Sequence, residues 1–266
     1  VAQVRATGLQ VTRATVPQLN AVVERVAERL ELRRIPSVYV VNDPIANAFV
    51  PSIAGGQAPV IVLNSGLVTL LSPNELEFAI GHELGHLGLR HGIDEKQSSP
   101  PSEFLALQVR SLQRYAEVSA DRVGLLATRS VFTSARVMIK IASGLQAESV
   151  AFDIEAFIQQ AERDPDELSR EWELDLSHPS LPFRLWALLR FSHCAEYSRM
   201  AGQGELGVSI SQVDQEVAER FAAMGDGRLD AMETKVYELA LVWAALAMVM
   251  DDGMIGSTKK DAFTQI

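Results

Sequence analysis

The sequence is poor in cysteine: its 266 residues include one, Cys194. A single cysteine excludes an intramolecular disulfide and any metal site built from several cysteines. The chain is therefore compatible with a reducing compartment, and a metal ion would have to be held by histidine and carboxylate side chains. Because 47% of the residues are apolar, a chain of this length can bury one large core.

Basic residues are scarce relative to acidic ones. The chain has 24 Lys and Arg against 34 Asp and Glu, which gives a formal net charge of -10. Because phosphate-rich surfaces attract Lys and Arg, this balance argues against nucleic acid and anionic membrane surfaces as partners. Proteins or peptides are the expected partners.

Long hydrophobic runs are missing as well. The apolar, uncharged stretch 239–250 is well short of the roughly 20 residues that cross a bilayer. We therefore expect a buried helix there, no membrane span in this chain and a cytoplasmic location. The sequence opens on Val1 rather than Met, so the alternative is a periplasmic or membrane-associated protein from which an N-terminal segment was removed.

The residue pattern predicts an α+β fold in which helices dominate. Apolar residues at helical spacing predict a first helix over 17–32. β-Branched runs at 38–41 and 60–63 predict strands of a small antiparallel sheet. Further helices are expected over 103–128, 131–145, 150–162 and 183–200.

A glycine-rich segment, 201–207, is the expected domain boundary. The chain would then consist of a main domain, residues 1–200, and a small helical module of uncertain role, residues 205–266. A protein partner for this module is one hypothesis for its role.

The chemistry-bearing part of the sequence is a helix with two histidines four residues apart. A capping-box pattern at residues 72–75 predicts that this helix begins there and runs to Gly92. Positions four apart share one helix face, so His82 and His86 can bind one ion. Glu83 can then take a proton from a water molecule that the ion acidifies. This H-E-x-x-H pattern predicts a zinc hydrolase site with one Zn²⁺ per chain.

The alternative is a surface helix whose polar residues fall into this spacing by chance. Ile80, Leu84 and Leu87 surround the histidines with apolar side chains, which favours a buried site over a solvated face. Gly85 costs the helix about 1 kcal/mol relative to alanine, so another element is expected to approach it closely. His91 is expected to cap the C-terminal end of the helix, with a second metal site as the alternative.

A second pair of candidate residues, Glu117 and Asp121, lies four apart on the helix predicted over 103–128. Because both carboxylates share one face, we assign Glu117 as the third zinc ligand. Asp121 is assigned as the acceptor that fixes the tautomer of one ligand histidine. Exchanged roles for the two acids, or a solvated acidic face, are the alternatives.

The combined motifs resemble those of the HtpX-like and CAAX-prenyl-protease-1-like zinc metallopeptidases. The sequence contains "HELGHLGLRH", then "EVSAD", then "HPSLPFR", which match H-E-x-x-H, E-x-x-x-D and H-P-x-x-x-x-R in that order. Over residues 15–195, the resemblance implies a gluzincin protease fold that acts on proteins or peptides. By the same resemblance, the zinc ligands are His82, His86 and Glu117, and the base is Glu83.

The resemblance also implies roles for residues around a cleft. His178 and Arg184 would close over it, where His178 could approach the zinc as a latency switch or help to stabilise the oxyanion. A peptide would bind in extended form along an edge strand at Asn47, Ala48 and Phe49. From the residues alone, His178 would be a turn residue, Arg184 a surface charge at a helix start, and Asn47 equally a strand-end turn residue.

Members of this group that are embedded in membranes have hydrophobic helices that this chain lacks, so it resembles a soluble branch. Residues 205–266 lie outside the peptidase pattern and weakly resemble helical TerB-like modules. The resulting hypothesis is a soluble zinc-dependent metalloendopeptidase. The alternative is a catalytically silent, zinc-containing scaffold that captures unfolded segments or a partner protein.

Overall fold

The computed structural model describes residues 1–51, 58–91, 103–146, 153, 156–157, 159, 178–204 and 206–223. The chain divides into two compact units, Val1–Arg220 and Phe221–Ile266. The helix expected over 150–162, the apolar stretch 239–250 and most of the module 205–266 lie largely or wholly outside the described residues. The domain boundary at 201–207 stays a prediction.

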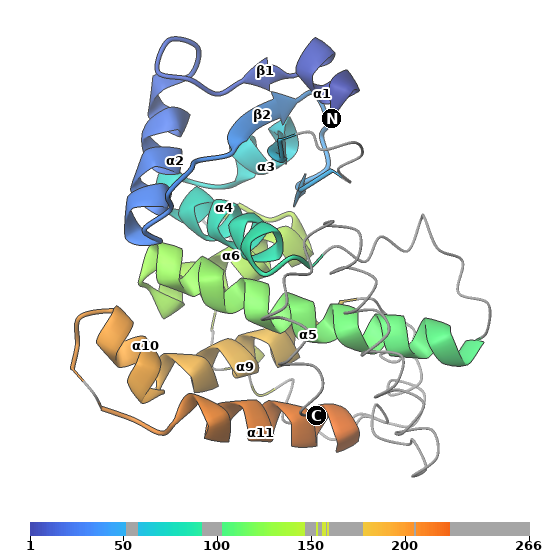
Figure 1. Cartoon of the computed structure of the whole chain (residues 1–266), viewed down its shortest axis with the longest axis vertical. Helices are drawn as coiled ribbons and strands as arrows, with labels where there is room; N and C mark the ends of the chain where they lie inside the picture. The colour runs from blue at the N-terminus through green and yellow to red at the C-terminus, as the bar shows by residue number, and fades with distance from the viewer. Residues whose placement is uncertain are drawn as a thin grey trace, which may run out of the picture. The chain divides into compact units, whose positions relative to one another are not determined.

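Helices make up most of the first unit and a small sheet completes it, which confirms the predicted α+β class. Figure 1 shows the sheet at one end of this unit, with α4 and α5 in the middle. The helices are α1 (Ala2–Thr7), α2 (Pro17–Arg29), α3 (Ser65–Leu70), α4 (Pro73–Gly88), α5 (Glu103–Thr128), α6 (Val131–Ser143), α9 (Leu181–Ser192), α10 (Ala195–Met200) and α11 (Ile210–Phe221). The strands are β1 (Leu9–Gln10), β2 (Ser37–Val41), β3 (Ala48–Phe49) and β4 (Val60–Asn64).

The sheet has the strand order β1-β2-β4-β3 and is mixed. The outer pairs, β1 with β2 and β3 with β4, are antiparallel, but the central pair β2 and β4 is parallel. The prediction of an antiparallel sheet was therefore wrong for that pair. After β2 the chain forms β3 at the edge of the sheet opposite β1. It then reverses direction and forms β4 between β2 and β3, so β4 is antiparallel to β3 and parallel to β2. Every residue of β4 is buried, as is usual for a central parallel strand.

Helix α4 begins where the capping box predicts. The Ser72 backbone N–H donates a hydrogen bond to Glu75 Oε2 at 2.8 Å. Lys140 of α6 donates to the same carboxylate oxygen at 2.8 Å, and both side chains are buried. The start of α4 is therefore held against α6 by a charge-assisted hydrogen bond.

The C-terminal end of α4 differs from the prediction, because the helix stops at Gly88 and not at Gly92. Arg90 has φ 57°, a left-handed conformation that costs a non-glycine residue about 1–2 kcal/mol. The next N–H, that of His91, donates back to the His86 carbonyl at 2.9 Å. This turn of Schellman type satisfies a carbonyl at the helix end and brings residue 91 back over the last turn.

The helix predicted over 183–200 is two helices, α9 and α10. Cys194 between them has extended backbone angles, φ -87° and ψ 153°. It forms a β-bridge to Val208, in which the Ala195 N–H donates to the Val208 carbonyl at 2.8 Å. A Cβ on Gly207 would lie 2.1 Å from the His193 carbonyl oxygen, so this close crossing requires glycine. The crossing interrupts a sequence whose spacing is otherwise helical.

Helix α4 packs directly on α5 through glycines, which confirms the close approach predicted at Gly85. A Cβ on Gly85 would lie 2.9 Å from Ala120 Cα and 3.1 Å from Val123 Cβ. A Cβ on Gly81 would lie 2.5 Å from the Ala127 Cβ. These contacts let the two helix backbones come close enough for side chains of both to form one site.

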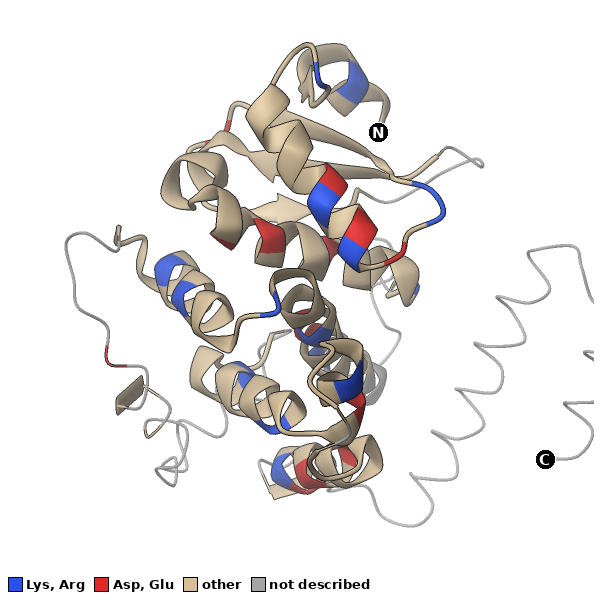
Figure 2. Cartoon of the chain, turned by 90° about the vertical axis from the view of Figure 1, so that its left-hand side faces the viewer, with Lys and Arg blue, Asp and Glu red and all other residues tan. Residues whose placement is uncertain are grey.

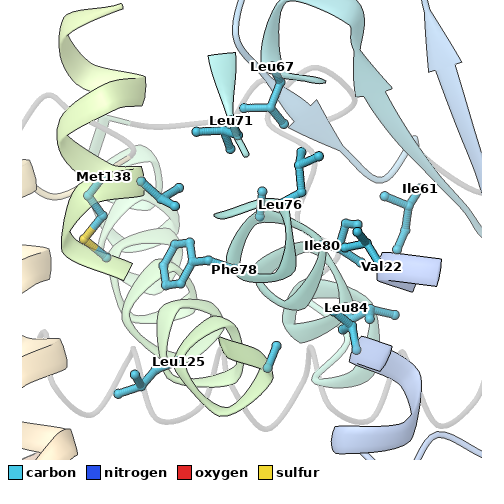
Figure 3. Close-up of a cluster of buried hydrophobic side chains, with 14 of the residues drawn as sticks. Val22, Ile61, Leu67, Leu71, Leu76, Phe78, Ile80, Leu84, Leu125 and Met138 are labelled. Carbon is cyan, nitrogen blue, oxygen red and sulfur yellow. The ribbon is translucent and has the colours of Figure 1, made fainter. Parts of the chain in front are cut away.

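Apolar side chains cover α4 on its remaining sides. Figure 3 shows Phe78 on the side of α4 that faces Met138 of α6, and Ile80 beside Val22 of α2 and Ile61 of β4. All five side chains are buried. The helix that carries the two histidines is therefore fixed by packing in several directions, which limits how far its side chains can shift.

Charged side chains of both signs are interspersed on the described helices, and Figure 2 shows Lys and Arg beside Asp and Glu on several of them. Arg25 and Arg29 of α2 pair with buried Glu77 of α4 at 2.9 and 2.5 Å. Arg29 also donates to the Ala127 carbonyl of α5 at 2.6 Å. These bonds join α2, α4 and α5.

In the part of the chain that the structure describes, no helix has both the length and the apolar character needed to cross a bilayer.

Replacing Gly85 with alanine is expected to lower the free energy of unfolding by about 1–3 kcal/mol, because the new methyl group overpacks the contact with Ala120 and Val123. Gly88→Ala is the matched control on the same helix, since a Cβ there meets nothing within 4 Å. That change should stabilise the protein by up to about 1 kcal/mol through helix propensity. Denaturant unfolding of both variants measures the difference, and equal effects would contradict the close packing of α4 on α5.

Candidate metal centre

Two imidazole nitrogens face each other on α4. The Nε2 atoms of His82 and His86 lie 3.0 Å apart, and both rings are partly exposed. The spacing of four residues places them on adjacent turns of one face. The two nitrogens can therefore reach one ion from the same side of the helix.

A carboxylate from α5 completes the group. Glu117 Oε1 lies 3.2 Å from His86 Nε2, and Glu117 Oε2 lies 3.6 Å from His82 Nε2. Each of the three residues offers one ligand atom, and these atoms all lie within 4.8 Å of one another. Ligands about 2.0–2.1 Å from a tetrahedral zinc ion are separated by roughly 3.3 Å, so the observed spacings fit such an ion. The donor set of two imidazoles and one carboxylate also matches catalytic zinc sites, which keep a fourth position open.

Asp121 and Arg184 lie behind the group. The His82 Nδ1–H donates to Asp121 Oδ1 at 3.0 Å, which leaves the His82 Nε2 lone pair free for a metal. Arg184 of α9 binds Asp121 through two hydrogen bonds of 2.8 and 2.7 Å. Its Nη1 also lies 3.0 Å from Glu117 Oε2. One guanidinium therefore holds both carboxylates of α5 in place.

Electrostatics keep both acids ionised. Burial raises the pKa of Glu117, but the positive charge of Arg184 and the hydrogen bond with His86 more than offset it, so the pKa lies far below its usual range. The same balance of burial against Arg184 lowers the pKa of Asp121. Burial lowers the pKa of His82, but the bond to Asp121 raises it above its ordinary value. A metal ion must therefore displace a proton from His82 when the pH is low.

Glu83 is buried next to the first histidine, with 7% of its surface exposed. Burial raises the pKa of its carboxyl group above the ordinary value, although His82 and His86 oppose the change. A raised pKa brings a carboxylate closer to the range in which it can take up and return a proton near neutral pH. Its predicted role as base stays a prediction.

The two residues of the H-P-x-x-x-x-R motif occupy different environments. His178 is 64% exposed, and its Nε2 lies 3.4 Å from Glu117 Oε1. Arg184 is 13% exposed and bonds to the acids. His178 therefore lies next to the candidate site, whereas Arg184 lies among the groups that support it. Neither predicted role is tested by these positions.

The predicted substrate strand is at the edge of the sheet. β3 pairs on one side with β4, through Ala48 with Leu63 and Phe49 with Val62. Asn47 and Phe49 are exposed, and β3 also contacts α4. Within the described residues, the other side of β3 pairs with no strand. Substrate binding by these three residues stays a prediction.

Sequence reasoning missed two sets of contacts at the site, those of His91 and those of Arg184. His91 follows the end of α4 as expected, but its ring Nδ1 lies 3.1 Å from His86 Nδ1 and its Nε2 lies 3.2 Å from Ser119 Oγ. Burial, followed by the nearby charge of His86, lowers the pKa of His91 to about 4. The salt bridges of Arg184 were the second omission. Two sequence features pointed to the contacts of His91: its place at the end of "HELGHLGLRH" and the serine between the two acids of "EVSAD". Neither feature shows that His91 and Ser119 contact each other.

Comparison with known proteins finds one matching family and several similar proteins. The model of Peptidase family M48 matches residues 13–100. Plastoglobule-localized metallopeptidase 48 of Arabidopsis thaliana is 26% identical over 230 residues, which are 78% of this chain and 66% of that protein. A Protease HtpX homolog of Moorella thermoacetica is 30% identical over 229 residues, 69% of this chain and 75% of the relative. No solved structure matches the chain.

Another relative is covered less completely. A Protease HtpX homolog of Thermodesulfovibrio yellowstonii is 38% identical over 81 residues, which are 29% of this chain and 27% of that protein. The chain thus spans just under two thirds of the Arabidopsis relative and about a quarter of this one. The family match covers the H-E-x-x-H helix, and the Moorella relative extends the similarity over most of the chain. The resemblance is confirmed, and the chain belongs to peptidase family M48, together with the HtpX homologues.

Proposed function

We propose that the chain is a zinc-dependent metalloendopeptidase that hydrolyses peptide bonds of proteins or peptides. The observation that carries this proposal is the convergence of two imidazole nitrogens from α4 and one carboxylate from α5 within 4.8 Å of one another. Membership of family M48 supports it, and so does the buried carboxylate of Glu83 beside the first histidine. Because the chain spans only part of some relatives, substrates and partners belong to the same proposal.

One Zn²⁺ per chain would be held by His82, His86 and Glu117. When bound, the ion supplies Lewis-acid polarisation of the scissile carbonyl and of a water molecule. Asp121 orients His82 through its Nδ1–H. The positive charge of Arg184 offsets part of the negative charge of the two buried acids, which would keep Glu117 ionised and available as a ligand.

Glu83 acts as the base in this proposal. Its carboxylate takes a proton from the attacking water as the new carbon–oxygen bond forms, and it then gives a proton to the leaving amine nitrogen as the carbon–nitrogen bond breaks. His178, which is exposed next to Glu117, would donate to the developing oxyanion in this proposal. The substrate backbone would bind along β3 in extended form, with Asn47, Ala48 and Phe49 in contact with it.

A second candidate function is a latent or catalytically silent binding protein. The observation that favours it is the position of His178, whose Nε2 lies 3.4 Å from Oε1 of the candidate ligand Glu117. An imidazole there could occupy the fourth position and exclude the reacting water. Residues 205–266 would then recruit a partner protein as a helical module. A cytoplasmic location belongs to both proposals.

Cleavage of an unfolded, fluorescently labelled casein by wild type and by His178→Ala tests both candidates. Each protein is assayed as purified, after chelation and after return of zinc. We expect cleavage that chelation abolishes and zinc restores. Faster cleavage by His178→Ala than by wild type would identify a latent enzyme, and slower cleavage would identify oxyanion stabilisation. The absence of cleavage by both proteins in the presence of zinc would contradict the peptidase proposal and favour the silent binding protein.

A further inference from the structure

The two histidines of the candidate zinc site are supported at their second nitrogens by different groups. His82 Nδ1 bonds directly to Asp121. His86 Nδ1 instead lies 3.1 Å from Nδ1 of His91, whose Nε2 lies 3.2 Å from Ser119 Oγ. Ser119 is on α5 between the two acids, so α5 supports Nδ1 of both histidines, that of His82 directly through Asp121 and that of His86 through His91.

The backbone brings His91 to this position. Its N–H donates to the His86 carbonyl at 2.9 Å, through the turn in which Arg90 adopts φ 57°. Capping of the helix requires this backbone bond alone. The ring of His91 makes two further contacts, one from each nitrogen, which capping does not explain.

The positions of the protons follow from the geometry. Two Nδ1 atoms 3.1 Å apart cannot both carry a proton between them. His86 Nε2 must be unprotonated to bind a metal, so the neutral ring carries its proton on Nδ1 and donates it to His91 Nδ1. A neutral His91 then carries its proton on Nε2 and donates to Ser119 Oγ.

The chain of donors ends on the backbone of α5. Ser119 Oγ lies 3.0 Å from the carbonyl oxygens of Tyr115 and Ala116, and the hydroxyl can donate to either one. The hydrogen bonds therefore all run in one direction: His86 donates to His91, His91 donates to Ser119, and Ser119 donates to the backbone. If the hydrogen bonds ran in the opposite direction, His86 would carry its proton on Nε2, the nitrogen that faces Glu117. That nitrogen could then not bind a metal.

We propose that His91, supported by Ser119, is a positioning residue that holds His86 in the Nδ1–H tautomer with Nε2 directed toward the metal. The inference rests on the zinc site of the proposed function. It assigns to His91 the role toward His86 that Asp121 has toward His82, and it gives the serine of "EVSAD" a role in metal affinity.

The test is the zinc dissociation constant, measured by competition with a chelator, for wild type and three variants. His91→Leu should weaken zinc binding about 10–100-fold, the usual effect of removing a group that orients a metal ligand. His91→Asn should recover much of the affinity, because its Oδ1 can accept the proton of His86 Nδ1. Ser119→Ala should weaken binding in the same direction by less. Circular dichroism of the zinc-free proteins checks that each variant is folded.

A second readout uses wild type alone and does not depend on how a variant folds. Nitrogen-15 NMR of the imidazoles in the zinc-loaded protein should show His91 protonated at Nε2 and bare at Nδ1. The inference would be overturned if the zinc dissociation constant of His91→Leu lay within about twofold of the wild-type value. It would also be overturned if His91 in the zinc-loaded protein carried its proton on Nδ1. Either result would leave the proposed function standing. Wild type that binds no zinc would overturn both.

Discussion

Replacing Glu83 with glutamine is expected to reduce cleavage by about 10²–10⁴-fold while zinc remains bound. The amide has nearly the shape of the carboxylate but cannot take a proton from water. Glu83 is not among the three residues that converge as ligands, so the metal site should survive. The measurement is kcat on the casein substrate together with zinc content per chain.

Glu77→Gln is the matched control for this prediction. Glu77 lies on the same helix and is similarly buried, with 4% of its surface exposed against 7% for Glu83. Its carboxylate pairs with Arg25 and Arg29 and does not face the histidines. The control should lose stability but keep its cleavage rate per folded molecule. Cleavage by Glu83→Gln at the wild-type rate would show that Glu83 is not the base.

Replacing Arg184 with methionine is expected to lower the free energy of unfolding of the zinc-free protein by about 3–5 kcal/mol. The guanidinium bonds to both Glu117 and Asp121, so its removal leaves two buried carboxylates without their cation. Zinc would supply positive charge beside Glu117, so the loss should be smaller in the zinc-loaded protein. Denaturant unfolding with and without zinc measures both quantities.

Arg190→Met is the matched control on the same helix. Arg190 also makes two hydrogen bonds to one carboxylate, that of Glu216, at 2.6 and 2.8 Å, but its side chain is 39% exposed. A pair as partly exposed as this one, with 39% and 26% of its two side chains exposed, is expected to contribute on the order of 1 kcal/mol, less than the buried pairs of Arg184. Equal losses in the two variants would contradict the role assigned to Arg184 among the buried acids.

The pH dependence of the Arg184 variant has a defined sign. In wild type, the pKa values of Glu117 and Asp121 lie below their ordinary values. The stability that they contribute is therefore present at neutral pH and is lost as the pH falls below about 4, where these carboxyls protonate in the unfolded chain. Without Arg184 the folded-state pKa values rise. The variant should therefore lose less stability than wild type when it is acidified.

Features set by near neighbours in sequence could be predicted. The capping box at residues 72–75 marks the start of α4, and uninterrupted helical spacing marks α5 from Glu103 to Thr128. Gly85 was predictable as a point of close approach because glycine weakens a helix unless another element requires it. The partner helix, α5, was not predictable from that position alone.

Features set by distant parts of the chain could not be predicted. The parallel pairing of β2 with β4 depends on where β3 inserts, and the break at Cys194 depends on a bridge to Val208. The end of α4 depends on the bonds that residue 91 makes with His86. In each case the local residue pattern is compatible with more than one structure. A contact with another part of the chain determines which of them forms.

Zinc content per chain, measured for wild type and Glu117→Ala after chelation and return of zinc, tests the metal site most directly. Glu117 supplies the carboxylate of the three proposed ligands, and its removal would leave two imidazoles on one helix, which are too few for a catalytic zinc site. We predict about one zinc per wild-type chain and much less in a folded Glu117→Ala protein. Wild type without zinc, or a variant that binds as much zinc as wild type, would contradict the site.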